Sequence, residues 1–129
     1  MASDLYDLEQ YVSGKCMYLA AALHRATGWE IQAAIEPAMA GYSRYVGHAW
    51  CVDPETGHCV DIDGAYPAKV NGWLHPENLL MPKMDENILY AVVAEGSPDL
   101  SRTKWDSEVT NALLVVQSFL LPKLSQVTA

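Results

Sequence analysis

Three parts of the chain have the composition or the apolar spacing of helices. Residues 4–12 place apolar side chains at the intervals of one helix face. Residues 15–26 (KCMYLAAALHRA) are rich in helix-forming residues and apolar on most faces, and Gly28 behind them is a typical helix stop. Residues 103–124 predict a long closing helix, which Pro122 should end or bend because proline lacks the N–H donor. The second of these helices should be central and buried.

Other stretches are short and either alternating or apolar, which is typical of strands: residues 29–35, 48–53, 58–63 and 88–95. The turn sequence DPETG joins the second of them to the third and predicts a hairpin. Glycine and proline in residues 37–46 and 65–85 predict loops, the latter with one short helical turn. This order predicts an α+β domain, in which a small antiparallel sheet packs against a central N-terminal helix and a long C-terminal helix.

The length of 129 residues predicts a single domain over residues 1–129. Sixteen acidic residues against eight Lys and Arg give a net charge of −8, which excludes the basic surface that nucleic acids and anionic membranes attract. The chain begins without a basic, apolar leader and has no apolar run of about 20 residues. We therefore expect a cytoplasmic protein, although export without a cleaved signal is compatible with the same sequence.

Three cysteines, Cys16, Cys51 and Cys59, are an odd and sparse set for a disulfide framework and fit a reducing compartment. No pair has the CxxC spacing, and alternation along the hairpin puts Cys51 and Cys59 on opposite faces, so no metal site is expected. The sequence also has no glycine-rich phosphate loop and no dinucleotide fingerprint, so no cofactor is expected.

The predicted hairpin brings a histidine to an aspartate. If Asp53 and His58 close the loop between them, the register places His48 opposite Asp63, with Cβ atoms about 5 Å apart. A carboxylate at that distance fixes the tautomer of an imidazole and stabilises its protonated form. A loop one residue shorter or longer would change this pairing. Asp61, two residues earlier on the same face, is the alternative partner.

Cys16 is the candidate nucleophile because it opens the apolar helix. The partial positive charge of a helix N-terminus favours thiolate over thiol, and Lys15 adds positive charge nearby. A thiol, an imidazole base at His48 and an orienting carboxylate at Asp63 form the set that thiol-dependent catalysis needs. The alternative is that Cys16 is a small buried residue and His48 a structural histidine.

The order of these residues resembles the papain-like and transglutaminase-like thiol enzymes. The chain has Cys16 at a helix start (GKCMYLAAAL), His48 at a strand start (GHAW) and Asp63 at the end of the next strand (CVDIDG). The resemblance covers residues 10–64, and the compact size is similar to that of papain-fold toxins and glutamine deamidases. It implies a papain-like core with Cys16 as nucleophile, His48 as base and Asp63 as orienter. Gln10 has a spacing from Cys16 similar to that of the glutamine that stabilises the oxyanion in papain-like proteases.

We therefore expect a thiol-dependent amide hydrolase or acyl transferase that acts on a protein or peptide amide: a glutamine deamidase, a transglutaminase-like enzyme or a peptidase. The chain lacks the Cys-Gly-Ser-Cys-Trp context of papain and has little length for a second lobe, which favours deamidation or transfer over general proteolysis. The alternative is a catalytically inactive binding module that acts through its apolar C-terminal helix and acidic surface. The apolar residues 113–121 also predict either packing on the sheet or a homodimer interface.

Overall fold

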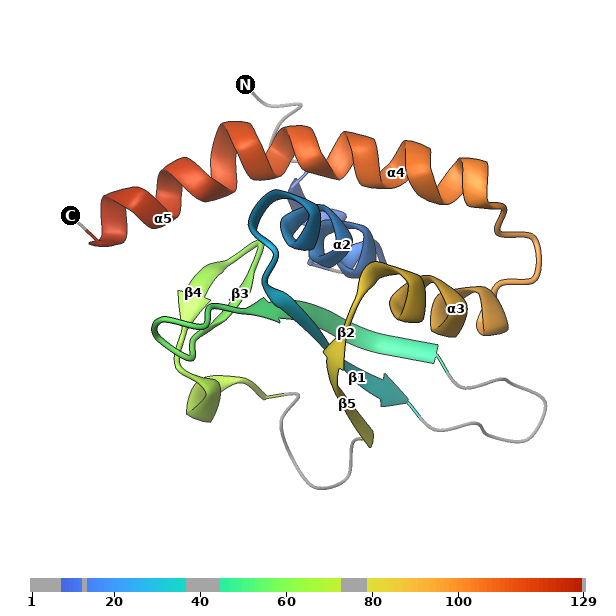
Figure 1. Ribbon diagram of the computed structural model, residues 1–129, viewed down its shortest axis with the longest axis horizontal. Helices are drawn as coiled ribbons and strands as arrows, with labels where there is room; N and C mark the ends of the chain where they lie inside the picture. The colour runs from blue at the N-terminus through green and yellow to red at the C-terminus, as the bar shows by residue number, and fades with distance from the viewer. Residues whose placement is uncertain (1–7, 13, 37–44, 73–78, 129) are drawn as a thin grey trace.

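The computed structural model describes residues 8–12, 14–36, 45–72 and 79–128 (Figure 1). A five-stranded sheet in the order β4-β3-β2-β1-β5 has antiparallel neighbours throughout. Its strands are β1 (Glu30–Glu36), β2 (Tyr45–Val52), β3 (Cys59–Asp61), β4 (Gly64–Tyr66) and β5 (Leu79–Met84). The α-helices are α2 (Cys16–Thr27), α3 (Glu86–Gly96), α4 (Arg102–Val115) and α5 (Leu121–Thr128), and a short 3-10 turn covers Ala68–Val70.

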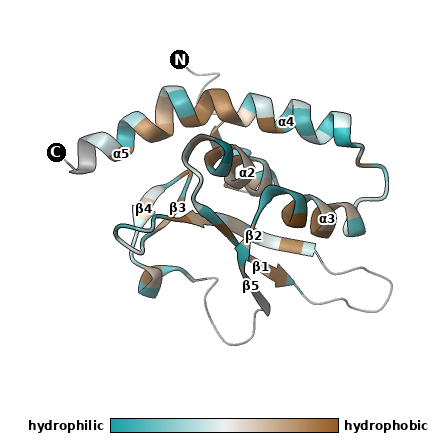
Figure 2. Ribbon diagram, in the orientation of Figure 1, coloured by the Kyte–Doolittle hydropathy of each residue, from teal (hydrophilic) through white to brown (hydrophobic). Residues whose placement is uncertain are grey.

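The molecule is layered around α2. Helices α2 and α3 lie over one face of the sheet, and the long helix formed by α4 and α5 crosses α2 on the side away from the strands (Figure 1). Because α2 is covered on both sides, most of it is buried, from Leu19 to Leu23 without interruption. Figure 2 shows hydrophobic colours on α2 and hydrophilic colours on much of α4. The predicted α+β architecture, with a central N-terminal helix and a long C-terminal one, is confirmed.

The predicted hairpin is also confirmed, including its register. The main-chain N–H of Asp53 donates to His58 O at 3.0 Å and closes the loop between the two strands. Cys51 then faces Val60. The strand predicted at residues 29–35 is β1, which pairs with β2 on its other side. Of the helix predicted at residues 4–12, the structure describes residues 8–12, of which 8–9 are helical; most of the loop predicted at 37–46 lies outside the described residues.

The strand predicted at residues 88–95 is wrong, because this segment is helix α3. The Asp85 side chain caps the helix by accepting the Ile88 N–H at 2.9 Å. Leu89, Val92 and Val93 then fall on one buried face at helical spacing. The stretch 65–85, predicted as loop, contains the expected helical turn but also β4 and β5.

The closing helix continues through Pro122 and bends there, which is one of the two predicted outcomes. Between α4 and α5 lies a π-helical turn, Val116–Leu120, after which the Leu121 N–H donates to Val116 O. This wider turn directly precedes the proline, which has no N–H and crowds the carbonyl of the preceding turn. The helix bends here, as expected, and Figure 1 shows the axis changing direction between α4 and α5.

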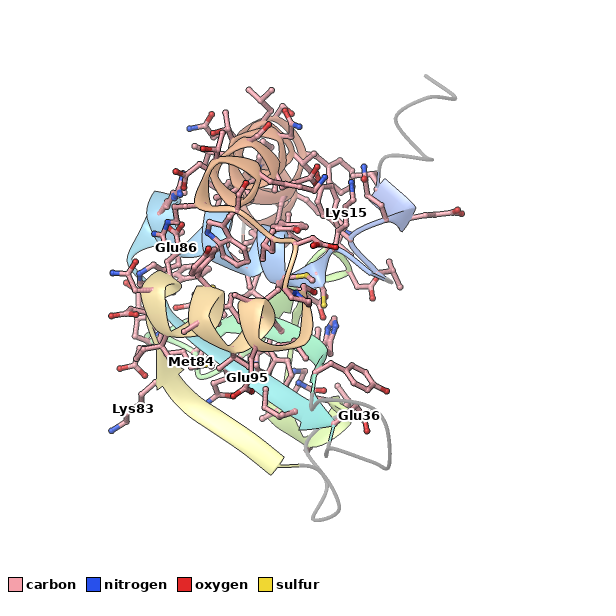
Figure 3. All side chains as sticks on the ribbon, turned by 90° about the vertical axis from the view of Figure 1, so that its right-hand side faces the viewer. Lys15, Glu36, Lys83, Met84, Glu86 and Glu95 are labelled. Atoms are coloured by element: carbon pink, nitrogen blue, oxygen red, sulfur yellow. The ribbon has the colours of Figure 1, made fainter. Side chains whose placement is uncertain are left out.

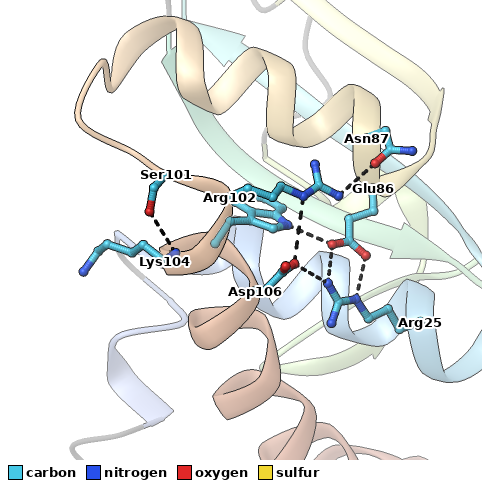
Figure 4. A network of polar contacts seen from close by, with 8 residues as sticks. Arg25, Glu86, Asn87, Ser101, Arg102, Lys104 and Asp106 are labelled. Atoms are coloured by element: carbon cyan, nitrogen blue, oxygen red, sulfur yellow. Dashed lines mark hydrogen bonds and ion pairs between the residues drawn. The ribbon is translucent and has the colours of Figure 1, made fainter.

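A polar network joins the ends of three helices (Figure 4). The Arg25 guanidinium at the end of α2 donates twice to the Glu86 carboxylate at the start of α3, at 2.6 Å for each bond. From α4, the Trp105 indole N–H donates to Glu86 at 2.8 Å, and Asp106 accepts from Arg25 at 3.1 Å. Because one carboxylate ties α2, α3 and α4 together, this network fixes the helix layer above the sheet.

Within the described ranges, no helix combines the length and apolar character needed to cross a membrane.

Candidate active site

Three predicted site residues come from three different elements and meet in the structure. Cys16 is the first residue of α2, His48 lies in β2, and Asp61 is the last residue of β3. His48 Nε2 lies 2.9 Å from Asp61 Oδ2, and the His48 ring is also hydrogen-bonded to the Cys16 side chain. All three residues are buried, with exposed fractions of 5–7%. The arrangement is a thiol, an imidazole and a carboxylate in one hydrogen-bonded chain.

Asp61, and not Asp63, is the partner of His48, which corrects the expected pairing. The hairpin register is as predicted, but β3 ends at Asp61 before it reaches the position opposite His48. The chain then turns into β4, so that the Asp63 side chain is exposed. Asp61 reaches the imidazole from the diagonal position of the ladder, which is within reach of a histidine side chain.

Two further groups hold the Asp61 carboxylate. The Tyr66 hydroxyl donates to Oδ2 at 2.6 Å, and the main-chain N–H of Asp63 donates to Oδ1 at 2.9 Å. Sequence reasoning missed Tyr66. The pair Asp63-Gly64, which is typical of a tight turn, was the available signal, because a strand after that turn returns Tyr66 to a position beside Cys59.

Burial and hydrogen bonding act in opposite directions on this chain. Burial lowers the pKa of His48, but hydrogen bonds to Asp61 and Cys16 outweigh it and raise that pKa to about 9. Burial raises the pKa of Asp61, but hydrogen bonds from His48, Tyr66 and the Asp63 N–H hold it below its ordinary value. Burial, with Asp61 beside it, raises the pKa of Tyr66, so this hydroxyl stays a donor. At neutral pH the site therefore contains an imidazolium against a carboxylate.

The start of α2 supplies main-chain donors beside the thiol. Lys15 is the N-cap residue and makes no side-chain cap hydrogen bond, and the first N–H groups of any α-helix have no partner within the helix. The Lys15 N–H donates to Gln10 O at 2.9 Å, which fixes residues 8–12 against the helix start. The Gln10 side chain is half-buried. The Lys15 ammonium, expected to add positive charge near Cys16, pairs with Glu108 of α4 at 2.9 Å.

A cleft of about 340 Å³ opens onto the imidazole and the carboxylate; we call it the Asp61 cleft. Its size is within the range of small-ligand sites. Two exposed valines, Val12 and Val70, contribute to its walls. The described residues that line it are Val12, His48, Asp61, Asp63, Tyr66, Val70, Asn71 and Gly72.

The other two cysteines are buried on opposite faces of the hairpin, as alternation predicts. Cys51 donates to Ala20 O at 3.3 Å, and Cys59 Sγ accepts from Asn71 Nδ2 at 3.5 Å. In the part of the chain that the structure describes, no three side chains of the metal-binding types gather as a metal site would require.

A comparison of the chain with models of protein families, with curated proteins and with solved structures finds no match.

Proposed function

We propose that the protein is a thiol-dependent amide hydrolase or acyl transferase with Cys16 as nucleophile, His48 as acid and base, and Asp61 as the orienting carboxylate. The observation that carries the proposal is the continuous hydrogen-bonded chain from Cys16 through His48 to Asp61. The same three groups are what thiol-dependent acyl transfer requires. A papain-like core is part of the proposal and rests on the resemblance of residues 10–64.

In the proposed reaction, His48 starts as the imidazolium that the site holds at neutral pH, and the Cys16 sulfur, as the thiolate paired with it, attacks the carbonyl carbon of an amide. The C–S bond forms, and negative charge develops on the carbonyl oxygen, where the Cys16 main-chain N–H and the Gln10 side-chain amide would stabilise it. His48 then gives its proton to the leaving nitrogen as the C–N bond breaks. Water, or a second amine, then attacks the resulting thioester and gives its proton to His48, and the C–S bond breaks to restore the thiolate and the imidazolium. Deamidation or transfer on a protein or peptide amide suits one small cleft better than general proteolysis.

Alkylation of the thiols by iodoacetamide, followed by mass spectrometry, tests the proposal. At pH 7 we expect Cys16 to react first, because its side chain is paired with the His48 imidazolium. Burial raises the pKa of Cys51 and of Cys59, so these thiols stay protonated and serve as internal controls. Cys16→Ala should abolish the fast labelling, Cys51→Ala and Cys59→Ala should preserve it, and His48→Gln should slow it. Equal labelling of all three cysteines, or none at Cys16, would refute the proposal.

A binding module without catalysis is the second candidate, and one observation favours it. On the long C-terminal helix, Leu114 and Phe119 remain 63% and 38% exposed, which would suit a partner surface or a homodimer. Under this alternative the site would be a structural core element, and Cys16 would react no faster than Cys51 or Cys59. The alkylation experiment therefore separates the two candidates.

A further inference from the structure

A second hollow is lined by the sequence neighbours of Cys16 and His48 and differs in chemistry from the Asp61 cleft. It has a volume of about 370 Å³ and lies where the start of α2, the start of β2 and the end of α3 meet. Lys15 and Glu95, labelled in Figure 3, are next in sequence to two of its lining residues and locate it in the molecule. Its lining is Gly14, Met17, Tyr45, Val46, Gly47, Val93, Gly96 and Ser97. We call it the Met17 groove.

The Met17 groove adjoins the proposed reaction centre through the chain itself. Met17 directly follows Cys16, and Gly47 directly precedes His48. A group lodged in the groove would therefore contact residues that are one position along the chain from Cys16 and from His48. The groove also continues past its own volume, because Met17, Val93 and Ser97 line a further hollow of about 270 Å³ that reaches Leu100.

The proton transfer from His48 indicates which hollow binds the amine part of the substrate and which binds the acyl part. His48 must protonate the leaving nitrogen, so the amine side lies where the imidazole is accessible. The imidazole and its carboxylate line the Asp61 cleft, whereas the lining of the Met17 groove contains neither. The amine side therefore belongs to the Asp61 cleft, and the acyl side, which stays on the sulfur, belongs to the Met17 groove.

The chemistry of the groove defines the acyl group. None of the described residues that line it carries a charge, and Met17, Val46 and Val93 supply apolar walls. Transfer of a charged or amide side chain into such walls would cost free energy without compensating hydrogen bonds. The strand start at Tyr45–Gly47 provides main-chain groups of the kind that an extended peptide pairs with.

We propose that the Met17 groove binds the acyl side of the substrate through a bulky apolar residue of an extended peptide, close to the amide carbonyl that Cys16 attacks. This assignment rests on the proposed function. It makes apolar character on the acyl side, rather than the identity of the leaving amine, the main determinant of substrate choice.

Two peptidyl chloromethyl ketones that differ only in leucine or asparagine at the residue next to the reactive ketone test the assignment, with iodoacetamide as the small reference reagent. We expect the leucyl reagent to alkylate Cys16 at least about tenfold faster, the size of effect that small differences in an apolar pocket produce. In Tyr45→Ser and Met17→Gln, the two rates, each divided by the iodoacetamide rate of the same variant, should come within about twofold of each other. Ile88→Ser is the control: it replaces an exposed apolar residue of α3 that does not line the groove, and it should keep the wild-type ratio of the leucyl rate to the asparaginyl rate.

Equal rates for the two reagents in the wild-type protein, with Cys16 still alkylated by iodoacetamide, would overturn the assignment and leave the proposed function standing. A leucine preference that persists in both groove variants would overturn it as well. If iodoacetamide fails to alkylate Cys16 in the wild-type protein, the proposed function and this assignment fall together.

Discussion

Replacing Asp61 by asparagine should remove the charge that keeps His48 protonated while preserving the shape of the side chain. The pKa of His48 is raised from 6.5 to about 9 in the folded protein, an interval that corresponds to about 3 kcal/mol. Cys16 also contributes to the raised pKa of His48, so we assign about 2 kcal/mol of this free energy to the interaction with Asp61. In Asp61→Asn we expect the pKa of His48 to fall well below 9, because burial still lowers it and only the contribution of Cys16 still raises it.

The same shift determines how stability depends on pH. A histidine whose pKa is raised on folding stabilises the folded state fully below its unfolded value of 6.5, and this contribution is lost as the pH rises through about 9. The depressed pKa of Asp61 contributes stability above the ordinary carboxyl value near 3.8, and this contribution is lost as the pH falls through the depressed value. Between roughly pH 4 and pH 9 the pair is charged in both members.

The assay is an NMR titration of the histidine imidazoles combined with urea unfolding at pH 6 and pH 10. Asp63→Asn is the matched control, because it removes an exposed carboxylate two residues away that does not bond His48. We expect Asp61→Asn to be about 2 kcal/mol less stable than the control at pH 6 and within about 1 kcal/mol of it at pH 10. A His48 that still titrates near 9 in Asp61→Asn, or a stability gap that is the same at both pH values, would refute the reasoning.

Two further predictions concern the fold around the site, both measured by urea unfolding. Glu86→Gln should lower the unfolding free energy by about 1–3 kcal/mol, because Glu86 accepts two charge-assisted bonds from Arg25 and one from Trp105. As a control, Asp106→Asn should lower the unfolding free energy by less than about 1 kcal/mol, because the Asp106 side chain is 53% exposed. Equal losses in the two variants would contradict this account. Gly64→Ala should lower the unfolding free energy by about 1–3 kcal/mol, because Gly64 has φ of 111°, which a residue with a side chain disfavours. Gly72→Ala is the control and should leave the unfolding free energy nearly unchanged. An unchanged unfolding free energy in Gly64→Ala would show that the turn after Asp61 tolerates a side chain at this φ.

Features set by nearby residues were predictable from the sequence. The DPETG turn fixed the loop length, and with alternation this gave the register in which Cys51 faces Val60. The unbroken apolar character of residues 15–26 predicted a helix that is covered on both sides. Both signals are local, because a turn type and a helix periodicity are set within a few residues.

The errors arise where tertiary contacts or short-range turns override a local preference. The apolar run in α3 is short and contains Val92 and Val93, whose branched side chains favour strands, and only its packing against the sheet and the Asp85 cap decides for a helix. β5 pairs with β1 across a large sequence separation, which no local pattern reveals. Asp63 was expected in place of Asp61 because the register was extended past the point where the strand turns.

His48 and Asp61 are only 7% and 5% exposed, and a charged pair buried to this extent is not an effective way to stabilise a fold. Taking two charges out of water costs several kcal/mol for each ion, and well-packed apolar residues of similar volume usually stabilise a core as well or better. Placing the pair on a cleft also forfeits the packing contacts that an apolar core would make on that side. Tyr66 and the Asp63 N–H add further bonds whose effect is to orient the carboxylate toward one imidazole nitrogen. That orientation has no value for packing, but it leaves the rest of the ring directed at the Cys16 thiol, which is why we favour catalysis over a structural role for this group of residues.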